Sequence, residues 1–365
     1  MEKPSLGKRI WSFPLIKTKH GNIKIENLPW FLFHLTPIAA LFVEFHWGLV
    51  VLALGLYFAR MFAVTGFYHR YFSHRGYTVN SRIVQFLMAF WGATALQQGP
   101  IWWASHHRHH HRWSDTEKDL HSPLRMGFWR SHVLWIFFID DNPDFKNHDY
   151  SKVRDLTRYP ELLWIDRHYY MGGVVLGVVL FAIGGLPWLI WGLGISTVLL
   201  WHGTFTINSL SHVFGKQRFE TGDTSRNNLL LAFVTLGEGW HNNHHFYQGG
   251  AKAGFYWWEI DITYYGLWCM HKLGLIQKLP VPPERVIETG REMDRVRAQA
   301  RRILKPGIFR RLSVEELIIV VQAVNTCVDQ RVLRKLNLQE LRNQIARWKE
   351  SADEWLTSGP ALQPA

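Results

Sequence analysis

The feature that most constrains this fold is a stretch of 48 residues, from His168 to Gly215, that contains no Asp, Glu, Lys or Arg. Gly184-Gly185-Leu186-Pro187 interrupts the stretch with residues that favour a turn. A helix needs about 20 apolar residues to cross a bilayer core. The stretch therefore predicts two membrane spans joined as a hairpin, at about 169–185 and 187–207.

A second apolar region lies near the N-terminus. Asn27–Val43 carries none of the four charged residue types, and neither does Phe45–Ala59, which continues apolar to Phe67 after a single arginine. We expect a second hairpin here, with spans at about 27–43 and 46–68. Core helices of a soluble protein are the alternative for any one run, but two such hairpins favour a membrane protein. The mean hydropathy of −0.10 then averages apolar and polar parts.

Basic residues predict the orientation of these spans. The predicted turns at 44–47 and 184–187 carry no Lys or Arg, whereas six basic residues precede the first span: Lys3, Lys8, Arg9, Lys17, Lys19 and Lys24. The positive-inside rule therefore places both termini and the long loops in the cytoplasm of an integral, multi-pass protein. The net charge of +12 reflects this topology, and we expect no nucleic-acid partner.

Composition also predicts the domain boundaries. Residues 1–26 read as a cytoplasmic N-terminal segment and residues 27–280 as the membrane domain. Val281-Pro282-Pro283 reads as a linker, and residues 281–365 as a helical C-terminal extension that is either a solvated tail or a docking element.

Histidines are the most informative residues, because half of the 20 lie in three short clusters. Residues 69–74 read HRYFSH, residues 106–111 read HHRHHH, and residues 237–245 read GEGWHNNHH. His212 follows Asn208 by four residues at the end of the fourth predicted span. Outside the clusters, His34 and His168 read as structural or surface residues. His121, His132 and His202 are candidates for supporting or substrate-facing roles, or for structural ones.

Spacing gives the clusters a geometric meaning. Residues at i, i+3 and i+4 share one helix face, so an H-x-x-H-H segment presents three imidazoles to one side. His241, His244 and His245 fit this pattern. In the middle cluster both His107/His110/His111 and His106/His109/His110 fit it. His69 and His74 are five apart and point apart on an ideal α-helix, so we expect the helix to fray there.

So many imidazoles exceed the needs of one metal ion. Neutral imidazole suits zinc, copper, iron and nickel, and a structural zinc needs only four ligands. The pattern favours two metals. All clusters must lie on one side of the membrane to share a centre, so the uncharged run Ile83–His107 is expected not to cross. We predict that it lies at the interface or under the catalytic domain.

The clusters together resemble the membrane fatty acyl desaturases of the acyl-CoA/delta-9 type, with bacterial-like features. The resemblance rests on HRYFSH at 69–74, HRHHH at 107–111, NSLSH at 208–212 and GEGWHNNHH at 237–245. It is supported by WSDTEKDLH at 113–121 and GFWRSHVLW at 127–135, and it covers roughly residues 27–278.

The resemblance implies an all-α membrane protein with four spans in two hairpins under a cytoplasmic helical cap that holds two iron ions. It selects the His107 register. The implied ligands are His69, His74, His107, His110, His111, His212, His241, His244 and His245, with Asn208 holding a water. The implied reaction uses O2 and two electrons to place a cis double bond, expected at delta-9, in a saturated acyl chain. Trp102 and Trp103 are the candidates for a substrate tunnel wall.

The carrier and the electron donor stay open at this stage. Basic residues that would hold CoA are expected after the SHVxW segment, but Ile139, Asp140 and Asp141 stand there. Acyl-CoA, acyl lipid and acyl-carrier protein are all compatible. Two cysteines, Cys269 and Cys327, cannot hold an iron–sulfur cluster alone. Electrons are therefore expected from a separate ferredoxin or cytochrome b5 with its reductase.

Two rival functions are compatible with the same boxes. One is a di-iron membrane hydroxylase or monooxygenase on lipid or alkane chains, and the other is a membrane metal-binding or transport protein. Against the second, the clustered histidines stand at the ends of the predicted spans, whereas transport would need ionisable ligands within them.

Overall fold

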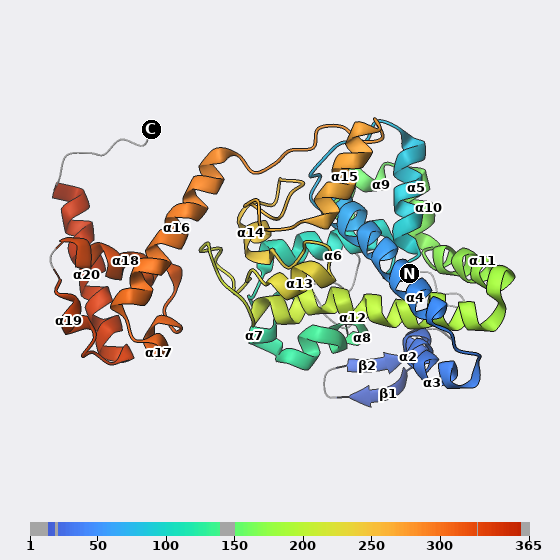
Figure 1. The fold of residues 1–365 in the computed structure, drawn as a ribbon, viewed down its shortest axis with the longest axis horizontal. Coiled ribbons are helices and arrows are strands. Elements are labelled where there is room, and N and C mark those ends of the chain that lie inside the picture. Colours follow the sequence, from blue (N-terminus) through green and yellow to red (C-terminus); the bar gives the residue numbers. More distant parts are fainter. Residues whose placement is uncertain (1–13, 19–20, 139–149, 327, 359–365) are drawn as a thin grey trace, which may run out of the picture. The chain divides into compact units, whose positions relative to one another are not determined.

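The computed structural model describes residues 14–18, 21–138, 150–326 and 328–358, and in these ranges the chain is mostly helical (Figure 1). The described strands form one antiparallel hairpin, β1 (Pro14–Thr18) and β2 (Gly21–Lys24). Residues 1–13 and 19–20 of the predicted N-terminal segment lie outside the described residues, and so do Ile139, Asp140 and Asp141 beyond the SHVxW segment. The chain divides into two compact units. The first comprises the chain up to Lys216 together with Asp223–Pro282, and the second comprises Gln217–Gly222 and the chain from Pro283 onward.

The long uncharged stretch forms a folded pair of helical legs. Helix α11 (Tyr170–Trp188) is followed by the π-helix η7 (Leu189–Ile195), by α12 (Ser196–Ser209) and by the short 3-10 turn η8 (Leu210–His212). Gly184 and Gly185 leave helical geometry, and Gly185 has a φ of +63°, which favours glycine. The legs pack closely, since a Cβ on Gly192 would lie 3.0 Å from Leu180.

The first apolar region contains one long helix rather than two. Helix α4 (Trp47–Phe62) continues into the π-helix η3 (Ala63–Ser73). The predicted span at 27–43 is wrong as a continuous helix. It is broken into η1 (Ile25–Asn27), α2 (Leu28–His34), α3 (Thr36–Ala39) and η2 (Ala40–Phe42).

Prolines explain this break. Pro29 and Pro37 each stand in the first turn of a short helix, where the missing N–H costs nothing, and a proline cannot continue the helix before it. Among the described residues, two helical stretches are long and apolar enough to cross a membrane, Trp47–Ser73 and Tyr170–His212.

The uncharged run Ile83–His107 lies in a short helix, α5 (Arg82–Ala93), a turn, and the first half of α6 (Pro100–Trp113). Twelve residues span about 18 Å, which is less than the roughly 30 Å of a bilayer core. Ile83, Leu87 and Trp91 are exposed along one side of α5, while Met88 and Ala89 are buried on the other. Helix α5 therefore presents an apolar stripe outward without being long enough to cross.

The remaining elements of the first unit are short. Some of them pack on η3, α5 and α6, around a core that includes Phe67, Phe72 and Ile101, and others pack on α12. These elements are α7 (Pro123–Met126), η4 (Arg130–Leu134), α8 (Trp135–Phe138), η6 (Tyr150–Val153), α9 (Arg154–Thr157), α10 (Pro160–Arg167), α13 (Leu229–Val234), α14 (His241–Phe246) and α15 (Ile262–Lys272).

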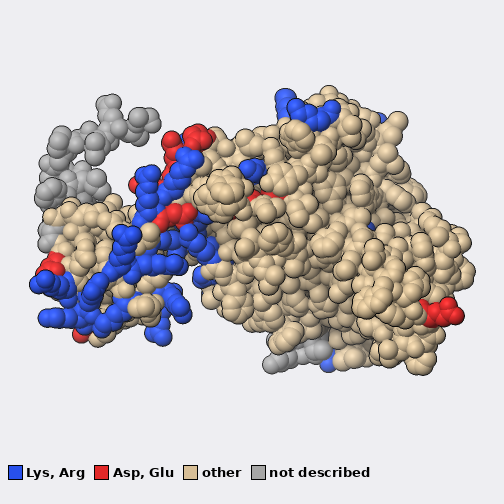
Figure 2. Space-filling model, in the orientation of Figure 1, with Lys and Arg blue, Asp and Glu red and all other residues tan. Residues whose placement is uncertain are grey.

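The second unit is helical and has its own core. Buried Leu317, Val320 and Leu333 lie in that core, and Ser313 and Glu316 form a capping box, with contacts of 3.1 and 2.7 Å between each side chain and the other's backbone N–H. Lys and Arg gather on the face of this unit shown in Figure 2, whereas the face of the first unit drawn there is largely uncharged. The helices of the second unit are α16 (Glu284–Ile303), α17 (Pro306–Phe309), α18 (Val314–Thr326), α19 (Gln330–Leu333) and α20 (Leu338–Ser358).

Candidate metal centre

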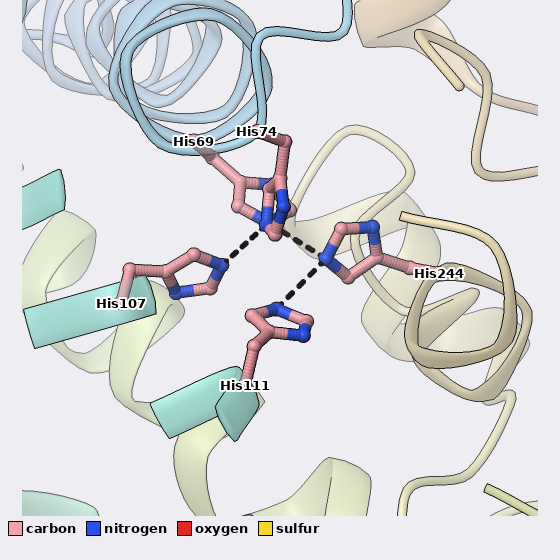
Figure 3. A group of neighbouring side chains, drawn as sticks. All are labelled: His69, His74, His107, His111 and His244. Atoms are coloured by element: carbon pink, nitrogen blue, oxygen red, sulfur yellow. Dashed lines mark hydrogen bonds between the residues drawn. The ribbon is translucent and has the colours of Figure 1, made fainter. Parts of the chain in front are cut away.

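Five histidines from three elements converge on one point beside the end of η3. Their rings point toward one another in Figure 3, and their nearest ring nitrogens all lie within 4.8 Å of one another. The Nε2 atoms of His69 and His244 are 3.0 Å apart, and those of His111 and His244 are 3.1 Å apart. The Nε2 atoms of His74 and His107 are 2.8 Å apart. We call this set, His69, His74, His107, His111 and His244, the five-histidine group.

Four further histidines form a neighbouring set, with ring nitrogens again within 4.8 Å of one another. We call His110, His212, His241 and His245 the four-histidine group. The Nε2 atoms of His212 and His241 are 3.1 Å apart. Helices α6 and α14 each contribute to both groups, so their i, i+3 and i+4 positions divide between two centres rather than facing one.

A π-helix, not fraying, brings His69 and His74 together. The backbone N–H of His74 donates to the carbonyl of His69, five residues earlier, at 3.2 Å. In this i→i+5 geometry the two residues stack one turn apart, and their ring centroids lie 4.8 Å apart. The expectation of a frayed helix end is therefore wrong, because a wider helical turn solves the same spacing problem.

The structure directs His106 and His109 away from both groups. His106 Nδ1 lies 2.6 Å from the carbonyl oxygen of Trp102. His109 Nε2 lies 2.8 Å from the carbonyl oxygen of Lys118, and its Nδ1 lies 3.0 Å from Nζ of Lys152. The residues that α6 turns toward the other boxes are those of the His107 register.

Arg108 fixes α6 against the end of η3. Its guanidinium donates to the carbonyls of Phe72 and Ser73 at 2.7 and 2.8 Å, and to both carboxylate oxygens of Asp155 at 2.7 and 2.9 Å. A bidentate arginine contact is directional as well as strong. Arg108 thereby sets the position of His107 relative to the first box.

Four carboxylates that sequence reasoning did not single out stand behind the ligands. Each lies against the Nδ1 of one histidine, on the side away from the cluster. The pairs are Glu238 with His69 at 2.8 Å, Asp119 with His110 at 3.0 Å, Asp115 with His212 at 3.1 Å, and Asp223 with His245 at 2.6 Å. Such partners fix the tautomer and orientation of ligating imidazoles.

Burial and crowding keep most of these imidazoles neutral. Burial, together with the neighbouring histidines, holds the pKa values of His74, His107 and His244 well below the usual range, and the same is true of His111 and His241. Burial also lowers the pKa of His245 to about 4, against the opposing effect of its Asp223 contact. Neutral imidazole is the form that binds metals.

The donor set fits two metal ions. Nitrogens bound at about 2.0–2.1 Å to one ion lie about 2.9–3.4 Å apart, which is close to the Nε2 separations found here. His245 Nε2 is buried and has no hydrogen-bond partner among the described residues, although its Nδ1 is held by Asp223. Its free lone pair faces the four-histidine group, as a ligand's would.

Two further residues with predicted roles are Asn208 and His121. Asn208 lies on α12, four residues before His212, and its backbone carbonyl accepts from the Ser131 hydroxyl at 2.9 Å. His121 stacks on His110 with ring centroids 4.3 Å apart, and Asp119 lies near both rings.

A large apolar cavity adjoins the five-histidine group. Its volume is about 1030 Å³, and both tunnel candidates line it. Trp103 stacks on His107 with centroids 4.8 Å apart, whereas Trp102 stacks on His106 at 3.8 Å. Of these two tryptophans, Trp103 is therefore the one that contacts the five-histidine group. The other lining residues include Trp30, Phe33, Phe137, Phe181, Leu193 and Phe205.

Comparison with known proteins identifies the family. The sequence pattern of fatty acid desaturases matches residues 45–268, a stretch that contains all nine histidines. The chain belongs to the fatty acid desaturase family. A chloroplastic palmitoyl-monogalactosyldiacylglycerol delta-7 desaturase of Arabidopsis thaliana is 39% identical over 253 residues, which are 69% of this chain and 67% of that one.

Other members of the family differ in carrier and bond position. An sn-2 palmitoyl-lipid 9-desaturase of Nostoc sp. (strain 36) is 39% identical over 260 residues, 70% of this chain and 85% of that one. An acyl-CoA 5-desaturase of Anemone leveillei is 36% identical over 262 residues, 69% of this chain and 80% of that one. The family thus identifies an oxidoreductase of fatty acyl chains, without deciding carrier or bond position.

Proposed function

We propose that this protein is an O2-dependent desaturase that inserts a cis double bond, at delta-9, into a saturated long-chain acyl group. One observation carries the proposal: two groups of converging imidazoles lie beside an apolar cavity, and Trp103 belongs to the wall of that cavity while stacking on His107. The overall reaction is R–CH2–CH2–R′ + O2 + 2 e⁻ + 2 H⁺ → R–CH=CH–R′ + 2 H2O.

The two histidine groups are the proposed iron sites. The five-histidine group would hold one iron and the four-histidine group the other, with Asn208 holding a water beside the second. When bound, the iron pair supplies the oxidising power that the side chains lack. The protein's own residues hold the ligands in orientation through the four carboxylates, and they exclude water by burying the histidines.

The cavity is the proposed acyl site. At about 1030 Å³ it is as large as the larger ligand pockets of proteins, and ten of its 24 lining residues are aromatic. Trp103 would place one carbon pair of the chain beside the five-histidine group. The acyl group would arrive as a CoA thioester or within a lipid.

Topology and electron supply complete the proposal. The broken segment at 27–43, α4, α11 and the leg from η7 to η8 would form four membrane segments, with the histidine groups and both termini on the cytoplasmic side. Residues 1–26, 27–280 and 281–365 would be the N-terminal segment, the desaturase domain and the helical extension. A separate ferredoxin or cytochrome b5, with its reductase, would supply electrons, and the basic cytoplasmic surface would attract such an acidic partner.

Lipid analysis of a host that expresses the protein tests this function. We expect new monounsaturated chains and two irons per purified chain, both lost in His244→Ala. Incubating membranes with labelled stearoyl-CoA or, separately, with labelled phospholipid then identifies the carrier and locates the double bond. Hydroxylated chains without unsaturation would instead indicate a hydroxylase. Stable binding of one zinc, with lipids unchanged, would indicate a metal-binding protein.

A further inference from the structure

Three other histidines form a hydrogen-bonded row outside the two groups. His34 ends α2, His202 lies within α12, and His132 lies in η4. His34 Nε2 is 3.1 Å from His202 Nε2, and His202 Nδ1 is 3.0 Å from His132 Nε2. The three are far apart in sequence, so only the fold brings them together. We call them the histidine chain.

The histidine chain is not another metal site. His202 stands in the middle and uses its two ring nitrogens toward opposite neighbours. Two nitrogens on opposite edges of one imidazole cannot both face the same ion. The contacts instead follow one another in a line, as they do in a proton-conducting wire. Ionisable residues within membrane segments commonly mark proton relays.

Both ends of the chain are defined by contacts. His34 Nδ1 lies 2.7 Å from the carbonyl oxygen of Trp30, and since a carbonyl only accepts, this nitrogen carries a proton. At the other end, His132 Nδ1 lies 2.9 Å from Oγ of Ser209. Ser209 is fully buried and stands three residues before His212 of the four-histidine group.

The number of available protons determines which protonation states the histidine chain can adopt. Four contacts connect the Trp30 carbonyl to Ser209, and each needs one proton, but three neutral imidazoles carry three. The fourth proton comes from Ser209 if its hydroxyl donates to His132. The hydroxyl also has a second acceptor, the carbonyl of Phe205 at 2.9 Å. If it donates there, the chain must carry one extra proton.

The chain therefore has two states that differ by one proton, and the same contacts satisfy both. Aromatic rings surround it: Trp30 stacks on His34 at 3.8 Å, and Phe128 on His132 at 5.6 Å. Burial lowers the pKa of His132, which favours the neutral state at rest, and the Phe205 backbone contact acts in the opposite sense.

We infer that the histidine chain and Ser209 form a proton relay that stores one proton and delivers it toward the four-histidine group. This rests on the proposed function, whose reaction consumes two protons per double bond, because O2 takes two electrons from the donor and two electrons with two hydrogens from the acyl chain. Delivery moves one proton from His132 Nδ1 to Ser209 Oγ, while the hydroxyl proton of Ser209 leaves toward the four-histidine group and ends in one of the two waters formed from O2. Each ring then takes a proton from its neighbour, and His34 becomes neutral.

The first test measures the protonation of the histidine chain in the absence of turnover. The full chain, labelled with ¹⁵N-histidine in lipid nanodiscs and loaded with diamagnetic zinc, gives ring-nitrogen signals for His34 and His132. Replacing the middle ring, His202→Phe, is expected to shift both signals. The matched control is His168→Phe, because His168 also bonds a carbonyl four residues back, that of Trp164 at 2.9 Å, but belongs to no chain. Unchanged His34 and His132 signals in His202→Phe would overturn the relay.

The second test uses the iron-loaded enzyme. In His202→Phe we expect wild-type iron content but roughly 10- to 100-fold slower product formation, a larger share of electrons recovered as hydrogen peroxide, and a larger rate ratio between H2O and D2O. Ser209→Ala, which keeps all three rings, should show the same uncoupling, and this covers the case in which His202→Phe fails to fold. His168→Phe should behave as wild type.

The outcomes separate the two proposals. Wild-type rates and coupling in Ser209→Ala or in folded His202→Phe overturn the relay and leave the desaturase intact. A wild-type protein that makes no double bond overturns the proposed function, while the ring-nitrogen signals still report whether the chain is connected.

Discussion

The two histidine sets show how the same side chain takes different roles. In the nine-histidine centre, Nε2 atoms face one another at 2.8–3.1 Å, and carboxylates stand behind four of the rings. In the histidine chain, the rings stand in line and the end contacts are a carbonyl and a hydroxyl. Converging lone pairs suit a cation, whereas a line of donors and acceptors suits a proton. What stands behind each ring thus decides its chemistry.

The largest predicted effect breaks the centre itself. His107→Ala removes a ring of the five-histidine group, so we expect turnover and bound metal to fall by more than the roughly 10–100-fold typical of losing a ligand's outer partner. His106→Ala, whose ring bonds the Trp102 carbonyl instead, should retain iron and most activity. Iron content per chain and product formation measure both. The reverse result would show that the other register of the box holds metal.

The next effect removes a carboxylate and keeps the ligands. Asp223→Asn leaves His245 in place but weakens the 2.6 Å contact that orients its ring. We expect metal affinity to fall roughly 10–100-fold, measured by competition with a chelator. His202→Phe, in the histidine chain, should leave metal affinity unchanged. Equal losses in the two variants would mean that the centre and the chain are one cooperative unit.

Much of the centre was predictable because its signal is local. The spacing of His107, His110 and His111 on one helix places three rings within two turns, and the family resemblance selected the register. The carboxylates were harder, since Asp115 and Asp223 lie 97 and 22 residues from the histidines they contact and follow no helical period. A π-helix has no simple sequence signature, so the spacing of His69 and His74 predicts a frayed helix end instead.

The fold shows the same division between local and distant signals. The hairpin turn at Gly184 and Gly185 was readable because glycine and proline mark turns locally. Pro29 and Pro37 are equally visible in the first apolar run, but hydropathy alone predicts a continuous span there, because it does not register helix breakers. The link of His34 to His202 joins residues 168 positions apart, and no local pattern could indicate it.

Acid should affect the metal-free centre through its neutral histidines. His245 has a pKa of about 4 when folded, because of burial, against about 6.5 when unfolded. The unfolded chain therefore binds a proton first as the pH falls, and stability is lost between pH 6.5 and 4, by up to about 3 kcal/mol from this group. Thermal unfolding midpoints of the metal-free protein should fall over this range. A His245→Gln variant should show a shallower fall, and an equal one would assign the effect to other groups.

The smallest predicted effect comes from a substitution at His34, the end of the histidine chain that lies away from Ser209. His34→Gln removes a half-buried ring that contacts Trp30 and His202, so we expect a loss of about 1 kcal/mol of folding stability, typical of one hydrogen bond. Metal affinity should not change, because none of the nine histidines contacts His34 in the described structure. His168→Gln, which loses one comparable contact to a carbonyl, is the matched reference for thermal unfolding. A drop in metal affinity confined to His34→Gln would show that the chain supports the centre structurally, and the contrast between ligand and relay would then fail.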